Sequence, residues 1–321
     1  IGLGSIASRH RRNLRKLFPD TLIISMSASG RMPNEDVSDS DMLVENIAQL
    51  IDSQVDLAIV ASPAPYHVEH AIPIIEARIP TLIEKPIATT LEGAQEIQNA
   101  ADKYNTPVSV GYCLRYLPSA LKVKELLDGH LIGTIYNANI EIGQYLPDWR
   151  PSKNYRDSVS AQKKLGGGAL FELSHEFDYA QWLLGPLMIK HAMLRSSDEL
   201  GLDVEDIADI TSVSEQGVVT TIHLDFLQRV AHRKCSFVGS NGRIDWDLIK
   251  NKVSLISAHK KTMLYSDEFW DKNQMYLAMF EDFVQMIQQK EHTCIRLSEA
   301  ARTISVIDDI KKHARNDMDS K

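Results

Sequence analysis

Apolar runs alternate with helical segments over the first third of the chain, and this alternation limits the folds available to it. Short apolar runs at residues 22–26, 55–61, 80–84 and 107–111 are typical of strands. Segments with helical spacing lie between them, at residues 8–17, 41–51, 68–77 and 90–104. Val55 to Ala61 is almost continuously apolar, as expected of a central parallel strand buried on both faces. The pattern predicts a doubly wound parallel sheet, of the α/β class, over residues 1–112.

The pattern changes after residue 112. A helix is expected at residues 119–127, and strands follow with turns between them at residues 135–143, 218–226, 234–238, 242–247 and 252–256. Helices are expected again at residues 275–289 and 298–313. At 321 residues the chain exceeds the size that one core usually serves. We expect a second, α+β domain over residues 113–321, built on a largely antiparallel open sheet, whose C-terminal helix could pack back on the first domain.

Composition excludes several classes of protein. Hydrophobic residues make up 44% and charged residues 24%, as in an ordinary globular protein, and the formal net charge is −8. An acidic chain is a poor binder of nucleic acid or anionic membranes, and no apolar run is long enough to span a bilayer. The three cysteines are far apart and predict free thiols in a reducing, cytoplasmic setting, with no metal spacing.

A glycine motif opens the chain. Residues 1–7 read Ile-Gly-Leu-Gly-Ser-Ile-Ala, so Ile1 is expected to end a strand and the motif has the form G-x-G-x-x-A. Such glycines let backbone approach a pyrophosphate at a helix N-terminus, although a plain glycine turn would look the same. The predicted contacts are Gly2, Gly4, Ser5, Ile6 and Ala7.

The end of the next strand normally selects the dinucleotide. An acidic residue there holds a ribose 2′-hydroxyl, whereas an arginine accommodates a 2′-phosphate. After this strand the chain has Ser27, Ser29 and Arg31, and the first carboxylate that follows is Glu35. The pattern favours NADP(H) over NAD(H), with a solvated Ser/Gly turn as the alternative.

Two loops follow later strands of the predicted parallel sheet. Ser62 and Pro63 begin the loop after residues 55–61, where a stiff turn would border a cofactor. Glu84-Lys85-Pro86 ends the strand at residues 80–84. Ligands of such sheets bind at the carboxyl ends of the strands, where a partly desolvated lysine can stabilise charge on a carbonyl oxygen. Lys85 is therefore a candidate catalytic residue, and a solvated Glu-Lys pair is the alternative.

A second group of polar residues follows Gly166-Gly167-Gly168. Residues 169–185 predict one amphipathic helix that ends at Gly185, with Glu172, His175, Glu176 and Tyr179 on the arc opposite its apolar stripe. His175 suits proton transfer near neutral pH. A metal site on these residues lacks the H-E-x-x-H spacing, so we expect none.

Together these segments resemble the glucose–fructose oxidoreductase and inositol dehydrogenase family (Gfo/Idh/MocA) over nearly the whole chain. The resemblance rests on the glycine motif, the Ser62-Pro63…His67 loop, Glu84-Lys85-Pro86, Gly111-Tyr112…Arg115, and the triple glycine with His175 and Asp178. It implies a Rossmann domain, a substrate domain, a nicotinamide cofactor and a homodimer or homotetramer formed through the open sheet.

The resemblance also implies roles for individual residues. Lys85 and His175 would face the substrate, the Lys85–Pro86 bond would be cis, and further cofactor contacts would come from His67, Glu84 and Arg115. Tyr112 would line the substrate site. Many members carry an acidic residue four positions before the histidine. Here Glu172 stands three before His175 and Glu176 follows it, so either or neither takes that role.

The segment at residues 145–156 resembles a subgroup found with nucleotide-sugar or surface-polysaccharide enzymes. Trp149, Arg150 and Tyr155 would suit a polar, ring-shaped ligand. An ordered loop pinned by its aromatic side chains is the alternative.

These observations predict an NAD(P)-dependent oxidoreductase. Hydride would pass between nicotinamide and a secondary alcohol or ketone of a sugar, cyclitol or sugar nucleotide. His175 would exchange the hydroxyl proton and Lys85 would stabilise the oxygen. Two alternatives remain open, an NAD-dependent glycosidase on the same fold and a non-catalytic NADP(H)-binding regulator.

Overall fold

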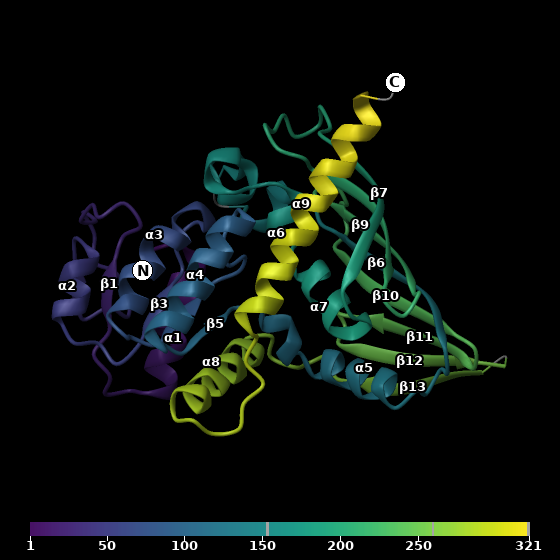
Figure 1. The fold of residues 1–321 in the computed structure, drawn as a ribbon, viewed down its shortest axis with the longest axis horizontal. Coiled ribbons are helices and arrows are strands. Elements are labelled where there is room, and N and C mark those ends of the chain that lie inside the picture. The colour runs from purple at the N-terminus through teal and green to yellow at the C-terminus, as the bar shows by residue number, and fades with distance from the viewer. Residues whose placement is uncertain (152–153, 259, 320–321) are drawn as a thin grey trace. The chain divides into compact units, whose positions relative to one another are not determined.

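A computed structural model describes residues 1–151, 154–258 and 260–319 of the chain. The chain divides into two compact units, and each is described by itself (Figure 1). The first unit contains residues 1–113 and 273–304, and the second contains residues 114–272 and the chain from residue 305 on.

The first unit is built on parallel strands. They are β1 (Ile24–Met26), β2 (Met42–Val44), β3 (Ala58–Val60), β4 (Thr81–Ile83) and β5 (Val108–Val110). β2 pairs with β1, and β3, β4 and β5 pair in that order, all in parallel. Ile1 joins the two groups, because Gly2 N–H donates to Met26 O at 2.8 Å and Ala61 N–H donates to Ile1 O at 2.8 Å. The predicted doubly wound parallel sheet is confirmed.

Helices connect these strands or pack beside them. They are α1 (Ser5–Leu17), α2 (Ile47–Asp52), α3 (His67–Glu76), α4 (Leu91–Tyr104) and, after residue 272, α8 (Gln274–Ile287). The Thr90 side chain caps α4 by accepting the Gly93 N–H, as residues of this type do at helix starts. Phe18 at the end of α1 packs edge-on against Phe280 of α8. The single helix predicted at residues 41–51 is wrong, since residues 42–44 extend to pair with β1 before α2 begins.

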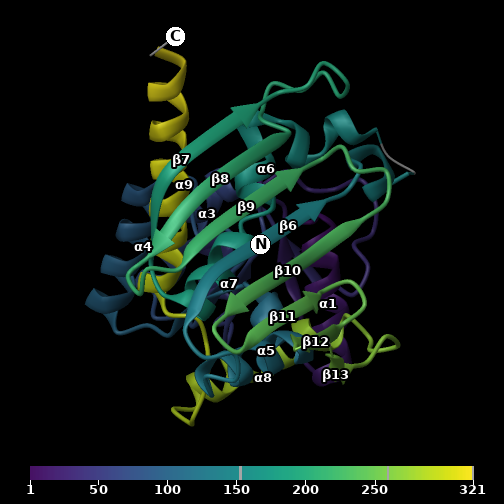
Figure 2. The ribbon, with the colours of Figure 1, turned by 90° about the vertical axis from the view of Figure 1, so that its right-hand side faces the viewer.

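The second unit is built on an eight-stranded sheet (Figure 2). Its strands are β6 (Ile135–Gly143), β7 (Leu187–Arg195), β8 (Ile207–Ser214), β9 (Val219–Asp225), β10 (His232–Gly239), β11 (Gly242–Asp247), β12 (Lys252–Ser257) and β13 (Lys260–Ser266). The order is β13-β12-β11-β10-β6-β9-β8-β7, and neighbours are antiparallel except β6 and β9, which run parallel. The largely antiparallel open sheet is confirmed, although β7, β8 and β13 were not predicted.

Helices cover one face of this sheet. In Figure 2 α5 (Pro118–Asp128), α6 (Ala169–Glu172), α7 (His175–Leu184) and the later part of α9 (Leu297–Asp319) lie behind the strands. Trp246 of β11 is fully buried beneath them and donates its indole N–H to Ser119 Oγ at 2.8 Å. Short 3-10 turns fill much of the chain between β6 and α6.

One predicted helix is broken. Residues 169–185 form α6 and α7, separated at Leu173 and Ser174, rather than one helix. The four polar residues predicted on one arc therefore do not share one environment. Glu176 and Tyr179 are fully buried, whereas Glu172 and His175 are half-buried. His175 is therefore the first residue of a new helix.

Candidate active site

The glycine motif forms a loop that leads into α1. Gly2 has φ +105°, and a Cβ there would lie 2.5 Å from Ala61 O, so only glycine fits between the ends of β1 and β3. Gly4 caps α1 without a side-chain hydrogen bond, and the first turn of α1 has no acidic residue. No described atom lies within 4 Å of a Cβ built on Gly4. The helix N-terminus is thus open to a ligand, which is the arrangement that fits a dinucleotide pyrophosphate.

The turn after β1 carries the residues predicted to select the dinucleotide. Ser27 follows β1 directly, and its hydroxyl donates to Arg31 O at 2.7 Å. Gly30 N–H donates to Ser27 O at 3.1 Å, which closes the turn. Ser29 and Arg31 are exposed. The turn can present hydroxyls and a guanidinium to a ribose.

The Glu84-Lys85-Pro86 segment follows β4 at the carboxyl edge of the parallel sheet. Lys85 is half-buried, and the Lys85–Pro86 bond is cis. The Glu84 side chain turns inward: the residue is 6% exposed, its Oε1 lies 2.6 Å from His10 Nε2, and its Oε2 accepts the Lys85 N–H at 3.2 Å. Glu84 was predicted to contact the cofactor, but its carboxylate is committed within the protein. It fixes the segment that carries Lys85.

The loop after β3 lies along the same edge. Ser62 is buried and Pro63 begins the 3-10 turn that leads into α3. The predicted cofactor contact His67 is 1% exposed, and both of its ring nitrogens face backbone carbonyl oxygens. Its side chain therefore contacts the loops of the site and is not exposed to a ligand.

The triple glycine makes room for the protein's own atoms. A Cβ on Gly167 would lie 2.5 Å from Val159 O, and one on Gly168 would lie 2.4 Å from a carboxylate oxygen of Glu205. Glu205 Oε1 accepts the Leu170 N–H at 3.1 Å at the start of α6. Burial raises the pKa of Glu205, and this hydrogen bond counters the shift. Backbone and Glu205 thus fix the start of α6, and with it the segment bearing Glu172 and His175.

Glu176 is not available to a substrate. Its side chain is fully buried, and Arg233 donates to its two carboxylate oxygens at 2.7 and 2.9 Å. The Tyr179 hydroxyl donates to the same carboxylate at 3.3 Å. Of the two acidic residues that the sequence offered, Glu172 is the one that keeps partial exposure.

Two more predicted ligand contacts are directed into the protein. Tyr112 is fully buried in the first unit. Arg115 lies in the second unit, where its guanidinium donates to both oxygens of Asp178 at 3.0 and 2.7 Å and lies over the Trp182 ring. The buried carboxylate neutralises this arginine, so it does not supply a free charge for a cofactor phosphate.

The aromatic segment after β6 is held in place by its own contacts. Trp149 packs edge-on against Phe226 and donates its indole N–H to Gln144 O at 3.3 Å. The Tyr155 hydroxyl donates to Leu200 O at 3.1 Å. These contacts favour the ordered-loop interpretation for Trp149 and Tyr155, while Arg150 is exposed.

Sequence reasoning missed two histidines beside the site. His10 of α1 bonds Glu84, and His70 of α3 lies with its Nδ1 2.9 Å from Ser62 Oγ. The three-residue spacing of His67 and His70, on one face of a helix after a Ser-Pro loop, was the available signal.

A cavity of about 450 Å³ lies in the first unit. Its lining includes Gly2 and Ala7 of the glycine motif and also Ile23, Leu57 and Ile79, which precede β1, β3 and β4. The cavity therefore extends along α1 from the glycine loop to the edge of the sheet opposite Lys85.

Two further features bear on the class of site. Among the described residues, no group of three or more His, Cys, Asp or Glu side chains is placed to hold a metal ion. A search of the same residues finds no helix long and apolar enough to cross a membrane.

Comparison with known proteins agrees with this geometry. Residues 1–112 match the oxidoreductase family with an NAD-binding Rossmann fold, and residues 120–245 match the GFO/IDH/MocA C-terminal domain. The inositol 2-dehydrogenase/D-chiro-inositol 3-dehydrogenase of Halalkalibacterium halodurans is 23% identical over 77% of this chain and 76% of its own length. The rhizopine catabolism protein MocA of Rhizobium meliloti is 29% identical over 41% of this chain, a stretch that spans only 39% of that relative.

Solved structures share the fold at low sequence identity. A levoglucosan dehydrogenase in complex with NADH and levoglucosan superposes with a TM-score of 0.85 at 18% identity, over 98% of this chain and 96% of that one. An inositol dehydrogenase homologue complexed with NAD⁺ from Azotobacter vinelandii gives a TM-score of 0.73 at 14% identity, over 85% and 81% of the two chains. With both of its domains matched, the chain belongs to the GFO/IDH/MocA family of oxidoreductases.

Proposed function

We propose that this chain is an NAD(P)-dependent oxidoreductase acting on a CH–OH group of a sugar, cyclitol or sugar nucleotide. The observation that carries the proposal is the position of Lys85. It follows β4 at the carboxyl edge of a parallel sheet whose glycine loop leaves the α1 N-terminus open. Membership of an NAD-binding oxidoreductase family supports it, as do relatives named as inositol dehydrogenases.

The first unit offers a place for each part of a dinucleotide. The N-terminal amides of α1 beyond Gly4 would hold the pyrophosphate. Ser27, Ser29 and Arg31 would hold the adenosine ribose, and the exposed arginine supports our preference for NADP(H) over NAD(H). Ser62 and Pro63 would border the ring end. When bound, the nicotinamide supplies the acceptor or donor of hydride.

In the proposed chemistry, His175 and Lys85 serve the substrate oxygen. On oxidation the carbon gives up its C–H electron pair as hydride, and His175 takes the hydroxyl proton. Lys85 donates a hydrogen bond to the oxygen and stabilises the negative charge that develops there. Glu172, half-buried one turn before His175, would orient the imidazole or bind a neighbouring hydroxyl.

The second unit would supply the rest of the substrate contacts. Exposed Arg150 is suited to an anionic or hydroxyl-rich group. Trp149 and Tyr155 would shape the segment that presents it. The aromatic packing and the hydrogen bonds that hold the segment support this assignment.

A substrate screen tests the proposed activity. Purified protein would be offered sugars, cyclitols and nucleotide sugars with NAD⁺ and with NADP⁺, and reduced nicotinamide would be followed by absorbance. We expect turnover with at least one polyol. Lys85→Ala and His175→Ala should each lower kcat by about 10²–10⁴-fold while cofactor binding persists. Near wild-type turnover in both variants would contradict the assigned roles.

We also propose that the open face of the eight-stranded sheet joins copies of this chain into a homodimer or homotetramer. The central strands present small polar residues on this face, among them Thr211, Thr221, Asn139 and Ser236, beside the ionisable residues Glu141, Asp209 and His223. A cytoplasmic setting remains part of the proposal, supported by three buried cysteines that carry thiols rather than disulfides, Cys113, Cys235 and Cys294.

A further inference from the structure

The Glu84 carboxylate lies where the chain leaves the parallel sheet. Glu84 N–H donates to Val60 O at 2.8 Å, so the sheet still holds the backbone of this residue. The next N–H, that of Lys85, donates to the side chain of Glu84, with 3.2 Å to Oε2. The position of this carboxylate therefore restricts the direction in which the chain continues into Lys85.

His10 of α1 holds the other oxygen of this carboxylate. Its Nε2 lies 2.6 Å from Glu84 Oε1, and the two side chains are 4% and 8% exposed. A carboxylate only accepts hydrogen bonds, so Nε2 of His10 carries the proton. The imidazole is packed edge-on against Tyr276 of α8. A hydrogen bond to a charged group is stronger than one between neutral groups, and burial keeps water from competing for it, so His10 restricts Glu84 closely.

Gly111, directly after β5, leaves room for the same carboxylate. A Cβ built on Gly111 would lie 3.1 Å from Glu84 Cδ and Oε2 and 3.2 Å from Oε1. These distances are shorter than ordinary van der Waals contact, so a methyl group there would displace the carboxylate by a few tenths of an ångström. The backbone of Gly111 lies outside the left-handed region, so alanine would not strain it. The absence of a side chain at residue 111 therefore serves Glu84 rather than a turn.

The two partners of the Glu84 carboxylate belong to different parts of the proposed site. α1 begins after Gly4, where its N-terminal amides would hold the pyrophosphate, and His10 lies in the second turn of the same helix. Lys85 would serve the substrate oxygen. Through Glu84, the helix that would bind the dinucleotide is thus connected directly to the residue that precedes the lysine.

We propose that His10 is a positioning residue that acts through the Glu84 carboxylate to set the direction of Lys85 relative to α1. It would thereby control the rate of hydride transfer and not the affinity for the dinucleotide. The proposal rests on the proposed function, since it assumes that Lys85 acts on the substrate oxygen. Misplacing a group at a reacting centre by about 1 Å can lower the rate by about 10²-fold, so a remote contact of this kind can matter.

The experiment compares kcat for the best substrate with the dissociation constant of the dinucleotide, measured by calorimetry on the full chain. His10→Leu loses the hydrogen bond to Glu84 and should lower kcat by about 10- to 100-fold, while the dissociation constant changes by less than about threefold. His10→Gln places an amide N–H near the position of Nε2 and should keep kcat within about threefold of wild type. Gly111→Ala displaces the carboxylate but keeps both of its partners, and should lower kcat by about three- to tenfold.

A second measurement determines whether His10 acts through Lys85. In a Lys85→Ala background no ammonium group remains to be positioned, so adding His10→Leu should lower kcat by less than about twofold further. A residue that only stabilises the fold would lower kcat by the same factor in both backgrounds. If His10→Leu fails to fold, Gly111→Ala takes its place in both comparisons.

A matched control perturbs the same helix one turn further on. Asn13 is buried, and its Oδ1 accepts a hydrogen bond from Asn273 Nδ2 at 2.7 Å. Asn13→Ala should lower the melting temperature and leave kcat within about twofold of wild type, because this hydrogen bond does not involve Glu84. The control separates positioning of Lys85 from a general loss of packing around α1.

The possible results separate this inference from the function on which it rests. If His10→Leu lowers kcat only where Lys85 is present, and His10→Gln restores it, the inference is supported. The inference is overturned, and the proposed function stands, if His10→Leu and Gly111→Ala keep the wild-type kcat. It is also overturned if the losses from His10→Leu and Lys85→Ala multiply, or if dinucleotide binding weakens as much as kcat falls. If wild-type protein turns over no substrate, both proposals fail.

Discussion

Glu176 carries a carboxylate into a fully buried position, and Arg233 is what makes this possible. Removing one partner of a buried ion pair leaves a buried charge without compensation. This lowers the free energy of unfolding more than breaking an exposed pair does. Glu176→Gln should therefore lower the free energy of unfolding by about 3 kcal/mol, measured by urea denaturation. Glu172→Gln is the matched control, with an expected loss below about 1 kcal/mol. An equal decrease in the free energy of unfolding for the two variants would show that the ion pair with Arg233 does not stabilise the fold.

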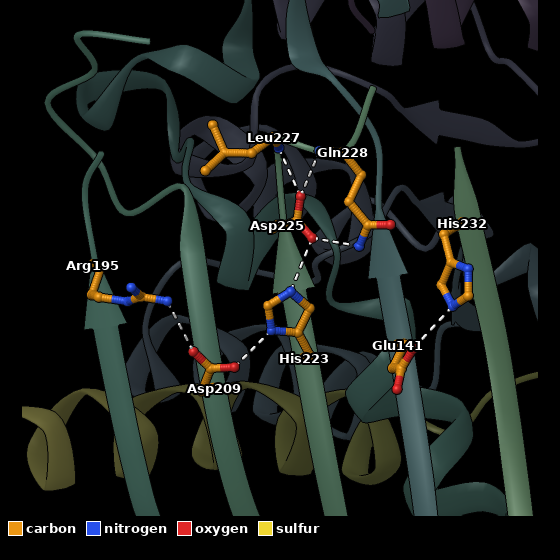
Figure 3. A network of polar contacts seen from close by, with 8 residues as sticks. All are labelled: Glu141, Arg195, Asp209, His223, Asp225, Leu227, Gln228 and His232. Carbon is orange, nitrogen blue, oxygen red and sulfur yellow. Dashed lines mark hydrogen bonds and ion pairs between the residues drawn. The ribbon is translucent and has the colours of Figure 1, made fainter. Parts of the chain in front are cut away.

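His223 gives the open sheet face a pH-dependent contact (Figure 3). Its Nε2 lies 2.9 Å from Asp225 and its Nδ1 lies 2.6 Å from Asp209, which Arg195 also contacts. The hydrogen bond with Asp225, followed by that with Asp209, raises the pKa of His223 to about 9, while partial burial opposes the shift.

Because the folded-state pKa of His223 exceeds the ordinary value of 6.5, its stabilisation is complete below pH 6.5 and is lost as pH rises to about 9. Thermal melts between pH 6 and 10 should show this loss in wild type. His223→Gln should flatten it, with an effect of about 1 kcal/mol or less because the ring is partly exposed. A wild-type slope retained in the variant would assign the pH dependence to other groups.

At single residues, the sequence predicted chemical type better than direction. Lys85 and His175 were chosen for their chemistry, and the structure leaves both half-buried at element ends. Glu176, Arg115 and Tyr112 have equally suitable side chains, yet they face inward. Nothing local distinguishes them. The partners that capture Glu176 and Arg115, at residues 233 and 178, lie 57 and 63 positions along the chain.

At the scale of elements, the two glycines of the first loop have different tasks. Gly2 has φ +105° and a Cβ there would meet Ala61 O at 2.5 Å, whereas no described atom approaches the corresponding position at Gly4. Gly2→Ala should lower the free energy of unfolding by a few kcal/mol, and the melting temperature should fall with it. Gly4→Ala should leave the melting temperature nearly unchanged and weaken dinucleotide binding about tenfold or more, because a ligand would occupy that space.

Melting curves with and without NADP⁺ distinguish the two effects. Wild type and Gly2→Ala should both gain stability on adding the dinucleotide, as binding to the folded state requires. Gly4→Ala should gain much less. If it gains as much as wild type, the pyrophosphate does not approach Gly4.

Elements with strong local patterns were predicted well, and those that depend on distant pairing were not. The predicted strands at residues 135–143 and 242–247 match β6 and β11 residue for residue. β2 was taken for the start of a helix because three residues carry little periodicity, and pairing with β1 decides their conformation. The break between α6 and α7 was likewise not predicted, because the apolar spacing continues across Leu173 and Ser174.

For the whole molecule, the open sheet face should govern assembly. Thr221 is exposed near its centre, bonded to Asn139 across β9 and β6. Thr221→Arg should reduce the molar mass measured by light scattering to that of a monomer, because a long charged side chain would be buried in the interface. Glu96→Arg, on exposed α4, is the control and should leave the mass unchanged. An unchanged mass for Thr221→Arg would place the assembly surface elsewhere.

We propose above that Lys85 and His175 act on the same substrate oxygen. The most direct measurement is a double-mutant cycle on kcat/KM with the best substrate, using Lys85→Ala, His175→Ala and the double variant. Residues that act together in one transition state are strongly non-additive, so the double variant should be scarcely slower than the slower single variant. Losses that simply multiply would contradict the claim and leave the two residues in separate roles.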